Sequence, residues 1–227
     1  MTRAYVDARR ARQWARSFLA GACLMLLSTM AVAQPAPAAA AGPNAARTVL
    51  VMGDSLSAAY GLRTDEGWVA LMAARGARER PGWRFVNASI SGETTAGGSA
   101  RIVSEVLRHR PTVVVIELGA NDALRGLPLR EMKRNLARMI GASQHVGAEV
   151  LLLGMRMPPN LGAEYTQGFE RTYRELADFF DVALLPFFLE PIATDRSAFQ
   201  DDNLHPVAGA QAALRDHVWP ALSPLMR

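Results

Sequence analysis

Four short stretches of the chain carry side chains that could together perform acyl transfer. They are Gly53–Leu56, Ser91–Glu93, Gly119–Asp122 and Asp202–Pro206. Between them they offer a hydroxyl nucleophile, an imidazole base, a carboxylate that can orient the base, and amide donors for a developing oxyanion. The prediction is a hydrolytic site made of separate segments, which the fold must bring together.

Ser55 is the predicted nucleophile. It follows an apolar run at residues 48–52 that is typical of a buried strand, and a serine just past such a strand can be reached by a substrate. The alternative is that Ser55 only caps a following helix, where serine is favoured. The local sequence lacks the second glycine of the G-x-S-x-G elbow, which argues against the common α/β-hydrolases. Three rival serines have less favourable placements: Ser57, Ser89 and Ser91.

His205 is the predicted base. Pro206 fixes the chain after it, and Asp202 lies three residues before it. Such a step in a helical turn puts both side chains on one side, so Asp202 can accept from one ring nitrogen while the other faces Ser55. Asp201 is a rival orienter, and a surface turn would explain an isolated Asp-x-x-His equally well. The other histidines are His109 and His145, at predicted helix ends that favour a cation, and His217, which has no evident partner.

Gly92 and Asn121 are the predicted oxyanion donors, together with the backbone N–H of Ser55. Glycine lets the backbone approach a substrate closely, and Asn121 can supply a side-chain amide N–H. The alternatives are a simple turn for Gly92 and a helix cap for Asn121. No His-x-x-x-His, Glu-x-x-His, Gly-x-Gly-x-x-Gly or Walker lysine motif accompanies them, so neither a metal nor another cofactor is predicted.

The elements that must position these residues alternate between strands and helices. Strands are expected at residues 48–52, 84–87, 112–118, 149–153 and 182–185, and several are apolar at consecutive positions, as in parallel sheets covered on both faces. Helical spacing marks residues 68–75, 102–107, 129–140, 169–180 and 207–219. The pattern predicts a three-layer α/β/α sandwich around a mostly parallel five-stranded sheet. Ser55, Gly92 and Asn121 each follow a predicted strand, so they should converge at one sheet edge.

The N-terminus has the features of an export signal. Five arginines precede the apolar run Phe18–Val32, which closes with the small-residue cleavage pattern Ala31-Val32-Ala33. We therefore expect a signal at residues 1–33, a Pro/Ala-rich disordered linker at 34–46 and one catalytic domain at 47–227. An uncleaved anchor is the alternative. The expected location is the periplasm, with full secretion left open.

The charge and cysteine content exclude several partners. Residues 1–33 contain five arginines and one aspartate, so they account for the whole formal charge of +4. The remainder is neutral, which gives no basic surface for nucleic acid or anionic lipid. The single cysteine, Cys23, lies within the expected signal, so no disulfide is expected in the mature protein.

The four motif blocks resemble those of the SGNH (GDSL) hydrolases. Longer strings are most similar to the exported thioesterase I / lysophospholipase L1 / arylesterase branch of that family: Met52–Ala58, Val86–Thr94, Glu117–Asp122 and Leu185–Phe188. The resemblance spans residues 48–225. Four ordered blocks are a specific signal, whereas a lone Gly-Asp-Ser-Leu is a weaker one. Ala120 departs from the second glycine that is common in close relatives.

The resemblance implies a flavodoxin-like sheet and metal-free cleavage of esters and thioesters through an acyl-serine intermediate. It assigns the nucleophile to Ser55 and the oxyanion donors to Gly92 and Asn121. The catalytic aspartate and histidine of the family correspond to Asp202 and His205. The segment at residues 122–128 resembles a loop that moves over bound acyl chains in the family.

A set of apolar loop residues near the expected crevice is hypothesised to line an acyl-chain site: Leu124, Leu127, Met157, Pro158 and Phe188. Ordinary loop packing is the alternative. The expected substrates are small acyl esters or thioesters, with lysophospholipids among the candidates, and the expected state is a monomer. Two rival functions remain open: a carbohydrate acetylesterase on the same fold, and a binding protein that has lost catalysis.

Overall fold

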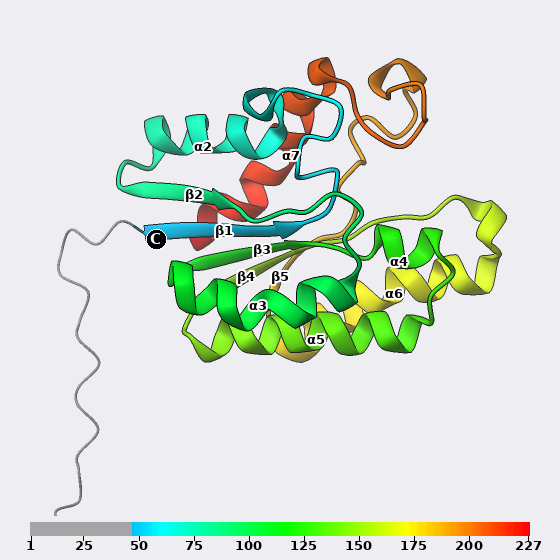
Figure 1. Ribbon diagram of the computed structural model, residues 1–227, viewed down its shortest axis with the longest axis horizontal. Coiled ribbons are helices and arrows are strands. Elements are labelled where there is room, and N and C mark those ends of the chain that lie inside the picture. The colour runs from blue at the N-terminus through cyan, green and yellow to red at the C-terminus, as the bar shows by residue number, and fades with distance from the viewer. Residues whose placement is uncertain (1–46) are drawn as a thin grey trace, which may run out of the picture. The chain divides into compact units, whose positions relative to one another are not determined.

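A single parallel sheet of five strands forms the centre of residues 47–227, which are the residues that the computed structural model describes (Figure 1). The predicted signal and linker lie outside the described residues. The strand order is β2-β1-β3-β4-β5. The strands are β1 (Arg47–Gly53), β2 (Trp83–Asn87), β3 (Val113–Glu117), β4 (Glu149–Leu153) and β5 (Ala183–Leu185). All five predicted strands are present, with ends that differ from the prediction by one residue at most.

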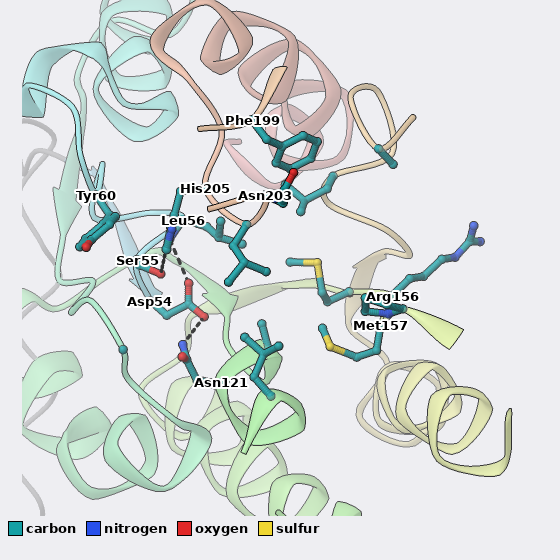
Figure 2. A pocket seen from close by; sticks show the side chains of 18 of the residues that line it. Asp54, Ser55, Leu56, Tyr60, Asn121, Arg156, Met157, Phe199, Asn203 and His205 are labelled. Atoms are coloured by element: carbon teal, nitrogen blue, oxygen red, sulfur yellow. Dashed lines mark hydrogen bonds between the residues drawn. The ribbon is translucent and has the colours of Figure 1, made fainter. Parts of the chain in front are cut away.

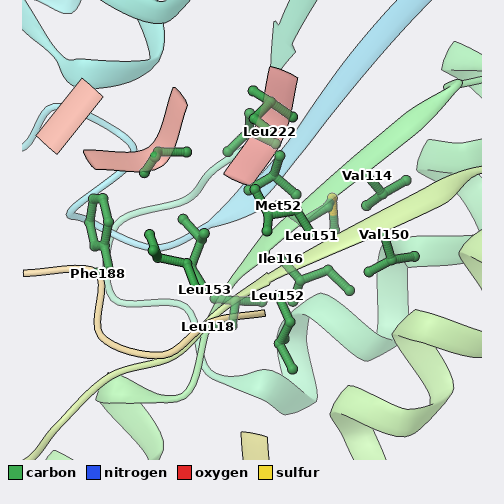
Figure 3. Packing of buried hydrophobic residues seen from close by; sticks show 14 of the residues in the cluster. Met52, Val114, Ile116, Leu118, Val150, Leu151, Leu152, Leu153, Phe188 and Leu222 are labelled. Atoms are coloured by element: carbon green, nitrogen blue, oxygen red, sulfur yellow. The ribbon is translucent and has the colours of Figure 1, made fainter. Parts of the chain in front are cut away.

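The central strands are buried on both faces, as their apolar sequences predict. Every residue of β3 is buried, and β4 is buried after its first residue. Met52 of β1 pairs with Ile116 of β3, and both side chains are fully buried. Figure 3 shows these strands contributing to one apolar cluster together with Leu151, Leu152 and Phe188. Burial on both faces requires helices on both sides of the sheet.

Helices cover both faces and complete the predicted three layers. α2 and α7 pack together on one face, whereas α3, α5 and α6 lie on the other (Figure 1). The α-helices are α2 (Trp68–Glu79), α3 (Thr95–His109), α4 (Ala120–Leu124), α5 (Leu129–His145), α6 (Ala163–Phe180) and α7 (Gln211–Leu222). The helix predicted at residues 169–180 lies within α6, and its aromatic residues Phe169 and Tyr173 are buried in the core. Within residues 47–227, no helix has both the length and the apolar character that spanning a membrane requires.

Two local expectations near the sheet edge need correction. Ser55 does not cap a helix, because residues 55–60 form successive turns and α2 begins only at Trp68. The side chain of Asp54, not Ser55, accepts the backbone N–H of Leu56 at 3.0 Å. Asn121 is not a helix cap either, because it lies within the short helix α4, whose N-cap is Gly119. Five residues are too few to give a helical period, which is why the sequence pattern did not reveal α4.

The strand order determines where a site can form. The chain passes from β1 outward to β2, then returns to β3 on the other side of β1 and continues to β4 and β5. The connection that leaves β1 and the connection that leaves β3 therefore run in opposite directions along the sheet. A crevice opens beyond the carboxyl ends of these two neighbouring strands. Ser55 follows β1 and Asn121 follows β3, so both reach this crevice.

Candidate active site

The nucleophile turn begins where β1 ends. The backbone N–H of Ala58 donates to the Asp54 carbonyl at 2.9 Å, and that of Tyr60 donates to the Ser55 carbonyl at 3.2 Å. These bonds hold Ser55 at the start of the turn. Its Oγ lies 2.8 Å from His205 Nε2, across 150 residues of sequence (Figure 2). The hydroxyl and the imidazole predicted to act together are thus in hydrogen-bonding contact.

The turn at residues 202–205 orients the imidazole. Asp202 Oδ2 lies 2.6 Å from His205 Nδ1, while its Oδ1 accepts the backbone N–H groups of Leu204 and His205 at 2.9 and 3.0 Å. The N–H of His205, its side chain and the N–H of Leu204 lower the pKa of Asp202 to about 2. Asp202 is therefore an anion when it accepts the hydrogen bond from His205 Nδ1–H. Asp202 is the partner of His205, and the rival Asp201 is not.

Two contacts join the histidine turn to the nucleophile turn. Gln200 Nε2 donates to the carbonyl of Tyr60 at 2.9 Å, and the Tyr60 ring lies over His205 with centroids 4.4 Å apart. Gly61 adopts φ +74°, and a β-carbon there would meet Gln200 Oε1 at 2.3 Å. Sequence reasoning missed Tyr60 and Gln200, because nothing in their spacing signals a contact between segments 140 residues apart.

Gly92 occupies the turn between β2 and α3 with φ +77°, a conformation that favours glycine. The backbone N–H of Glu93 closes this turn on the Ile90 carbonyl at 3.1 Å. The side chain of Glu93 forms an ion pair with Arg101 of α3, and Arg125 donates to the Gly92 carbonyl at 2.8 Å. The peptide at Gly92 is therefore held from both sides, at the wall of the cavity that Ser55 also lines.

Asn121 faces the same cavity from α4. Its Nδ2 donates one hydrogen to Asp54 Oδ2 at 2.9 Å, which leaves the second hydrogen for a substrate oxygen (Figure 2). The structure thus brings Ser55, Gly92 and Asn121 to one cavity, as the sequence predicted. Ala120, the departure from the family pattern, is the first residue of α4 and also lines that cavity.

Two buried carboxyls lie directly behind the nucleophile. Asp54 is 1% exposed and Glu117 is 2% exposed. Burial raises the pKa of Asp54 from 3.8 to about 6, although bonds from Leu56 N–H and Asn121 oppose this rise. Burial and the nearby Asp54 charge raise the pKa of Glu117 well above its usual value. Sequence reasoning missed both, yet a carboxyl at the end of the otherwise apolar strand β3 was a usable signal.

The cavity beside Ser55 has a volume of about 530 Å³ and a largely apolar wall. Leu124, Met157 and Pro158 line it, as predicted. Two of the five predicted lining residues are wrong. Phe188 is fully buried and packs against Trp68 with ring centroids 5.3 Å apart. Leu127 does not line the cavity either. Apolar residues not predicted for the wall include Met155, Phe187, Leu189, Ala193, Phe199 and Leu204.

The rival serines have other environments. Ser57 is buried and donates to Glu117 Oε2 at 2.7 Å, and the Ser89 hydroxyl is buried. Ser91 lines the cavity, but the histidine there is bonded to Ser55. Among the serines of residues 47–227, Ser55 is the one whose hydroxyl contacts a histidine. His217, for which no partner was evident from sequence, contacts the Phe187 carbonyl through Nε2 at 2.9 Å.

The chain is similar to known ester hydrolases. A family model described as the GDSL-like Lipase/Acylhydrolase family matches residues 51–213. Esterase TesA of Pseudomonas aeruginosa is 48% identical over 182 residues, which cover 80% of this chain and 90% of that protein. Thioesterase 1/protease 1/lysophospholipase L1 of Escherichia coli strain K12 is 38% identical over 182 residues, covering 80% and 86%. The crystal structure of the psychrotrophic esterase EstA from Pseudoalteromonas sp., inhibited by monoethylphosphonate, matches with a TM-score of 0.75 and 38% identity, covering 78% and 97%.

Proposed function

Because the chain belongs to the GDSL-like lipase/acylhydrolase family, and is therefore an ester-hydrolysing serine hydrolase of the SGNH type, we propose that it is exported and cleaves acyl esters and thioesters through an acyl-serine intermediate. The observation that carries the mechanism is the contact series from Asp202 through His205 to Ser55, at 2.6 and 2.8 Å. Such a series is what a serine nucleophile requires, because a hydroxyl alone is a weak nucleophile.

In the proposed first half-reaction, Ser55 Oγ attacks the substrate carbonyl carbon while its proton passes to His205 Nε2. The ionised Asp202 stabilises the imidazolium through Nδ1. The negative charge that develops on the carbonyl oxygen is taken up by the N–H groups of Ser55 and Gly92 and by Asn121 Nδ2. His205 then gives its proton to the departing alcohol or thiol, and the acyl–Ser55 ester remains.

In the second half-reaction, water replaces the alcohol or thiol. His205 accepts a proton from the water as its oxygen attacks the acyl–Ser55 carbonyl, and the same donors hold the second oxyanion. Collapse of this intermediate releases the carboxylic acid, and His205 returns the proton to Ser55 Oγ. Both halves use the same side chains and need no added cofactor.

We propose an acyl chain as the group that occupies the apolar cavity. Leu124, Met157 and Phe199 contribute to its wall, and the relatives named above include a thioesterase and lysophospholipase. The largely apolar wall of the cavity suits an acyl chain better than the hydroxyl groups of a carbohydrate, which favours this occupant over the carbohydrate acetylesterase alternative. Lysophospholipids and acyl thioesters are accordingly the proposed substrate classes.

One series of p-nitrophenyl esters, from acetate to dodecanoate, tests both the nucleophile and the substrate class. We expect the parent protein to hydrolyse medium-chain esters and to be labelled by a fluorophosphonate. Ser55→Ala should lower kcat by at least about 10³-fold and abolish labelling, because the acyl-serine cannot form. Ser104→Ala changes an exposed serine of α3 and is the matched control, with activity and labelling retained.

Three outcomes of this series would count against the proposal. A folded Ser55→Ala protein that hydrolyses the esters at the parent rate would show that another group is the nucleophile. Activity confined to the acetate ester would refute the acyl-chain assignment while leaving the nucleophile intact. An inactive parent protein that folds normally would favour a binding function.

A further inference from the structure

Glu117 is a buried carboxyl at the active site that the proposed reaction does not use. It ends β3, whose other four residues are apolar, and it is 2% exposed. In the sheet it pairs directly with Gly53, the residue before Asp54 and Ser55. A β-carbon at Gly53 would come within 2.8 Å of Glu117 Oε2, so this carboxyl is pressed against the start of the nucleophile turn.

The bonds of Glu117 connect it to that turn. Its Oε2 accepts from the Ser57 hydroxyl at 2.7 Å and from the backbone N–H of Asp54 at 3.3 Å. The bond from the Asp54 backbone sets the two carboxyls beside one another at the start of this turn, and the charge of Asp54 contributes to the raised pKa of Glu117. Since both of the donors just named bond Oε2, the oxygen Oε1 is the one available to carry a proton.

The surroundings cannot support two negative charges. Among residues 47–227, no lysine or arginine forms an ion pair with Asp54 or Glu117. Two carboxylates in contact and away from water repel, so one of them keeps a proton. Each carboxyl accepts two donors, but the bond from the Asp54 N–H to Glu117 is long at 3.3 Å, whereas Leu56 N–H and Asn121 Nδ2 donate to Asp54 at 3.0 and 2.9 Å. Asp54 also lies nearer to His205, whose positive charge favours the carboxylate, so Asp54 is the better anion. The proton therefore belongs on Glu117.

We propose that Glu117 is a positioning residue that stays protonated in the active enzyme and donates a hydrogen bond to Asp54, whose carboxylate in turn holds the Asn121 amide for the oxyanion. The chain of contacts runs from the sheet, through Asp54, to the cavity wall (Figure 2 draws the Asp54–Asn121 bond). This inference rests on the proposed role of Asn121. A protonated Glu117 presents a donor to one side of Asp54 while the other side receives Asn121.

The same arrangement predicts loss of function at alkaline pH. Removing the Glu117 proton would place two anions in contact and displace Asp54 from Asn121. The ionisable groups that act on the pair or are acted on by it are Tyr173 of α6 and His205 of the histidine turn. Tyr173 is buried, donates to the Leu118 carbonyl at 3.0 Å, and has a pKa that burial raises. None of these groups brings a fixed positive charge to stabilise a second carboxylate.

Two substitutions at position 117 separate this role from simple packing. Glu117→Gln keeps a donor that can face Asp54, whereas Glu117→Leu fills the space without one. We expect Glu117→Leu to lower kcat about tenfold with KM nearly unchanged, because the oxyanion donor Asn121 is then misplaced. The kcat of Glu117→Gln should remain within about threefold of the parent value, because the amide still holds Asp54 in position. The alkaline decline of kcat in the parent should be absent in Glu117→Gln. Glu105→Gln, on α3, is the matched control for the glutamate-to-glutamine change.

Equal kcat values for folded Glu117→Leu and Glu117→Gln, whether high or low, would overturn the proposal. A parent-like alkaline decline in Glu117→Gln would also contradict it. Circular dichroism and the melting temperature establish which variants fold.

A second measurement needs neither activity nor the leucine variant. The infrared spectrum of the parent minus Glu117→Gln at about pH 8 should contain the carbonyl band of a protonated carboxylic acid, since free glutamate is ionised there. A difference spectrum with only carboxylate bands would refute the protonated Glu117. This result is independent of the nucleophile test, so failure of one proposal is distinguishable from failure of the other.

Discussion

At the scale of single residues, the site contains two aspartates with opposite environments. Asp202 accepts two backbone N–H bonds and contacts His205, which lowers its pKa to about 2. Asp54 is almost completely buried, which raises its pKa to about 6. Asp202 is thus an anion at every pH where the protein works, whereas Asp54 changes charge within an accessible range. Environment, not residue type, determines their roles.

This contrast predicts how stability depends on pH. The pKa of Asp54 is higher in the folded protein than its usual 3.8, so the folded state binds more protons between the two values. The contribution of Asp54 to the free energy of unfolding should therefore fall as pH rises from about 4 through about 6, by about 3 kcal/mol in total. Urea unfolding of the parent and of Asp54→Asn at several pH values measures this difference.

Asp202→Asn provides the opposite case as a control. The pKa of Asp202 is lowered, so its stabilising contribution is present above the usual 3.8 and is lost as pH falls through about 2. Stability differences that stay constant over pH for both variants would contradict these assignments.

At the scale of elements, the turn between β2 and α3 carries the Gly92 peptide into the cavity. Gly92 and Gly147 both have positive φ, +77° and +80°. A β-carbon at Gly92 would have Arg125 Nη2 as its nearest neighbour, at 3.8 Å, and a β-carbon at Gly147 would have no neighbour within 4 Å. Substitution by alanine at either site therefore adds backbone strain without a steric clash. The two glycines differ in location, because Gly147 follows α5 and precedes β4.

We expect Gly92→Ala and Gly147→Ala to lose similar stability, about 1–2 kcal/mol each, from the left-handed backbone alone. Only Gly92→Ala should also lower kcat, by about tenfold or more, since relief of the strain moves an oxyanion donor. Melting curves and ester kinetics on both variants provide the comparison. Equal loss of kcat in both would mean that Gly92 affects activity only through stability.

At the scale of the whole molecule, the predicted leader and the winding of the sheet have separate consequences. The winding places the site between β1 and β3, and the leader accounts for the entire net charge of the chain. A neutral mature enzyme would approach acyl substrates without electrostatic attraction to anionic surfaces. The proposed export, with cleavage of the signal, would therefore change both the location of the protein and its charge.

Export predicts cleavage after Ala33 in a bacterial host. Intact mass and cell fractionation should find a periplasmic protein that begins at Gln34. Ala33→Asp should accumulate as uncleaved precursor, because the cleavage site requires a small residue, whereas Ala39→Asp should be processed normally. A full-length parent protein that stays in the cytoplasm and is active there would refute the export proposal.

The sequence by itself determined the sheet, the helices that cover it and the residues that meet in the site. Short runs of consecutive apolar and β-branched residues are typical of strands buried on both faces, and the motif blocks identified Ser55, Asp202 and His205 through their chemistry. The local sequence pattern did not predict elements as short as α4. It also could not decide whether an apolar residue lines the cavity or packs in the core. Phe188 was placed in the cavity by its type, yet it packs in the core.

Only the tertiary structure decided which neighbours each side chain meets. The Tyr60–His205 contact, the Gln200 bond between the two catalytic turns and the Glu117–Asp54–Asn121 series all join segments far apart in the chain. Burial, and with it the raised pKa values of Asp54 and Glu117, also depends on this packing. Sequence spacing specifies local geometry, whereas the environment of a charge is a property of everything folded around it.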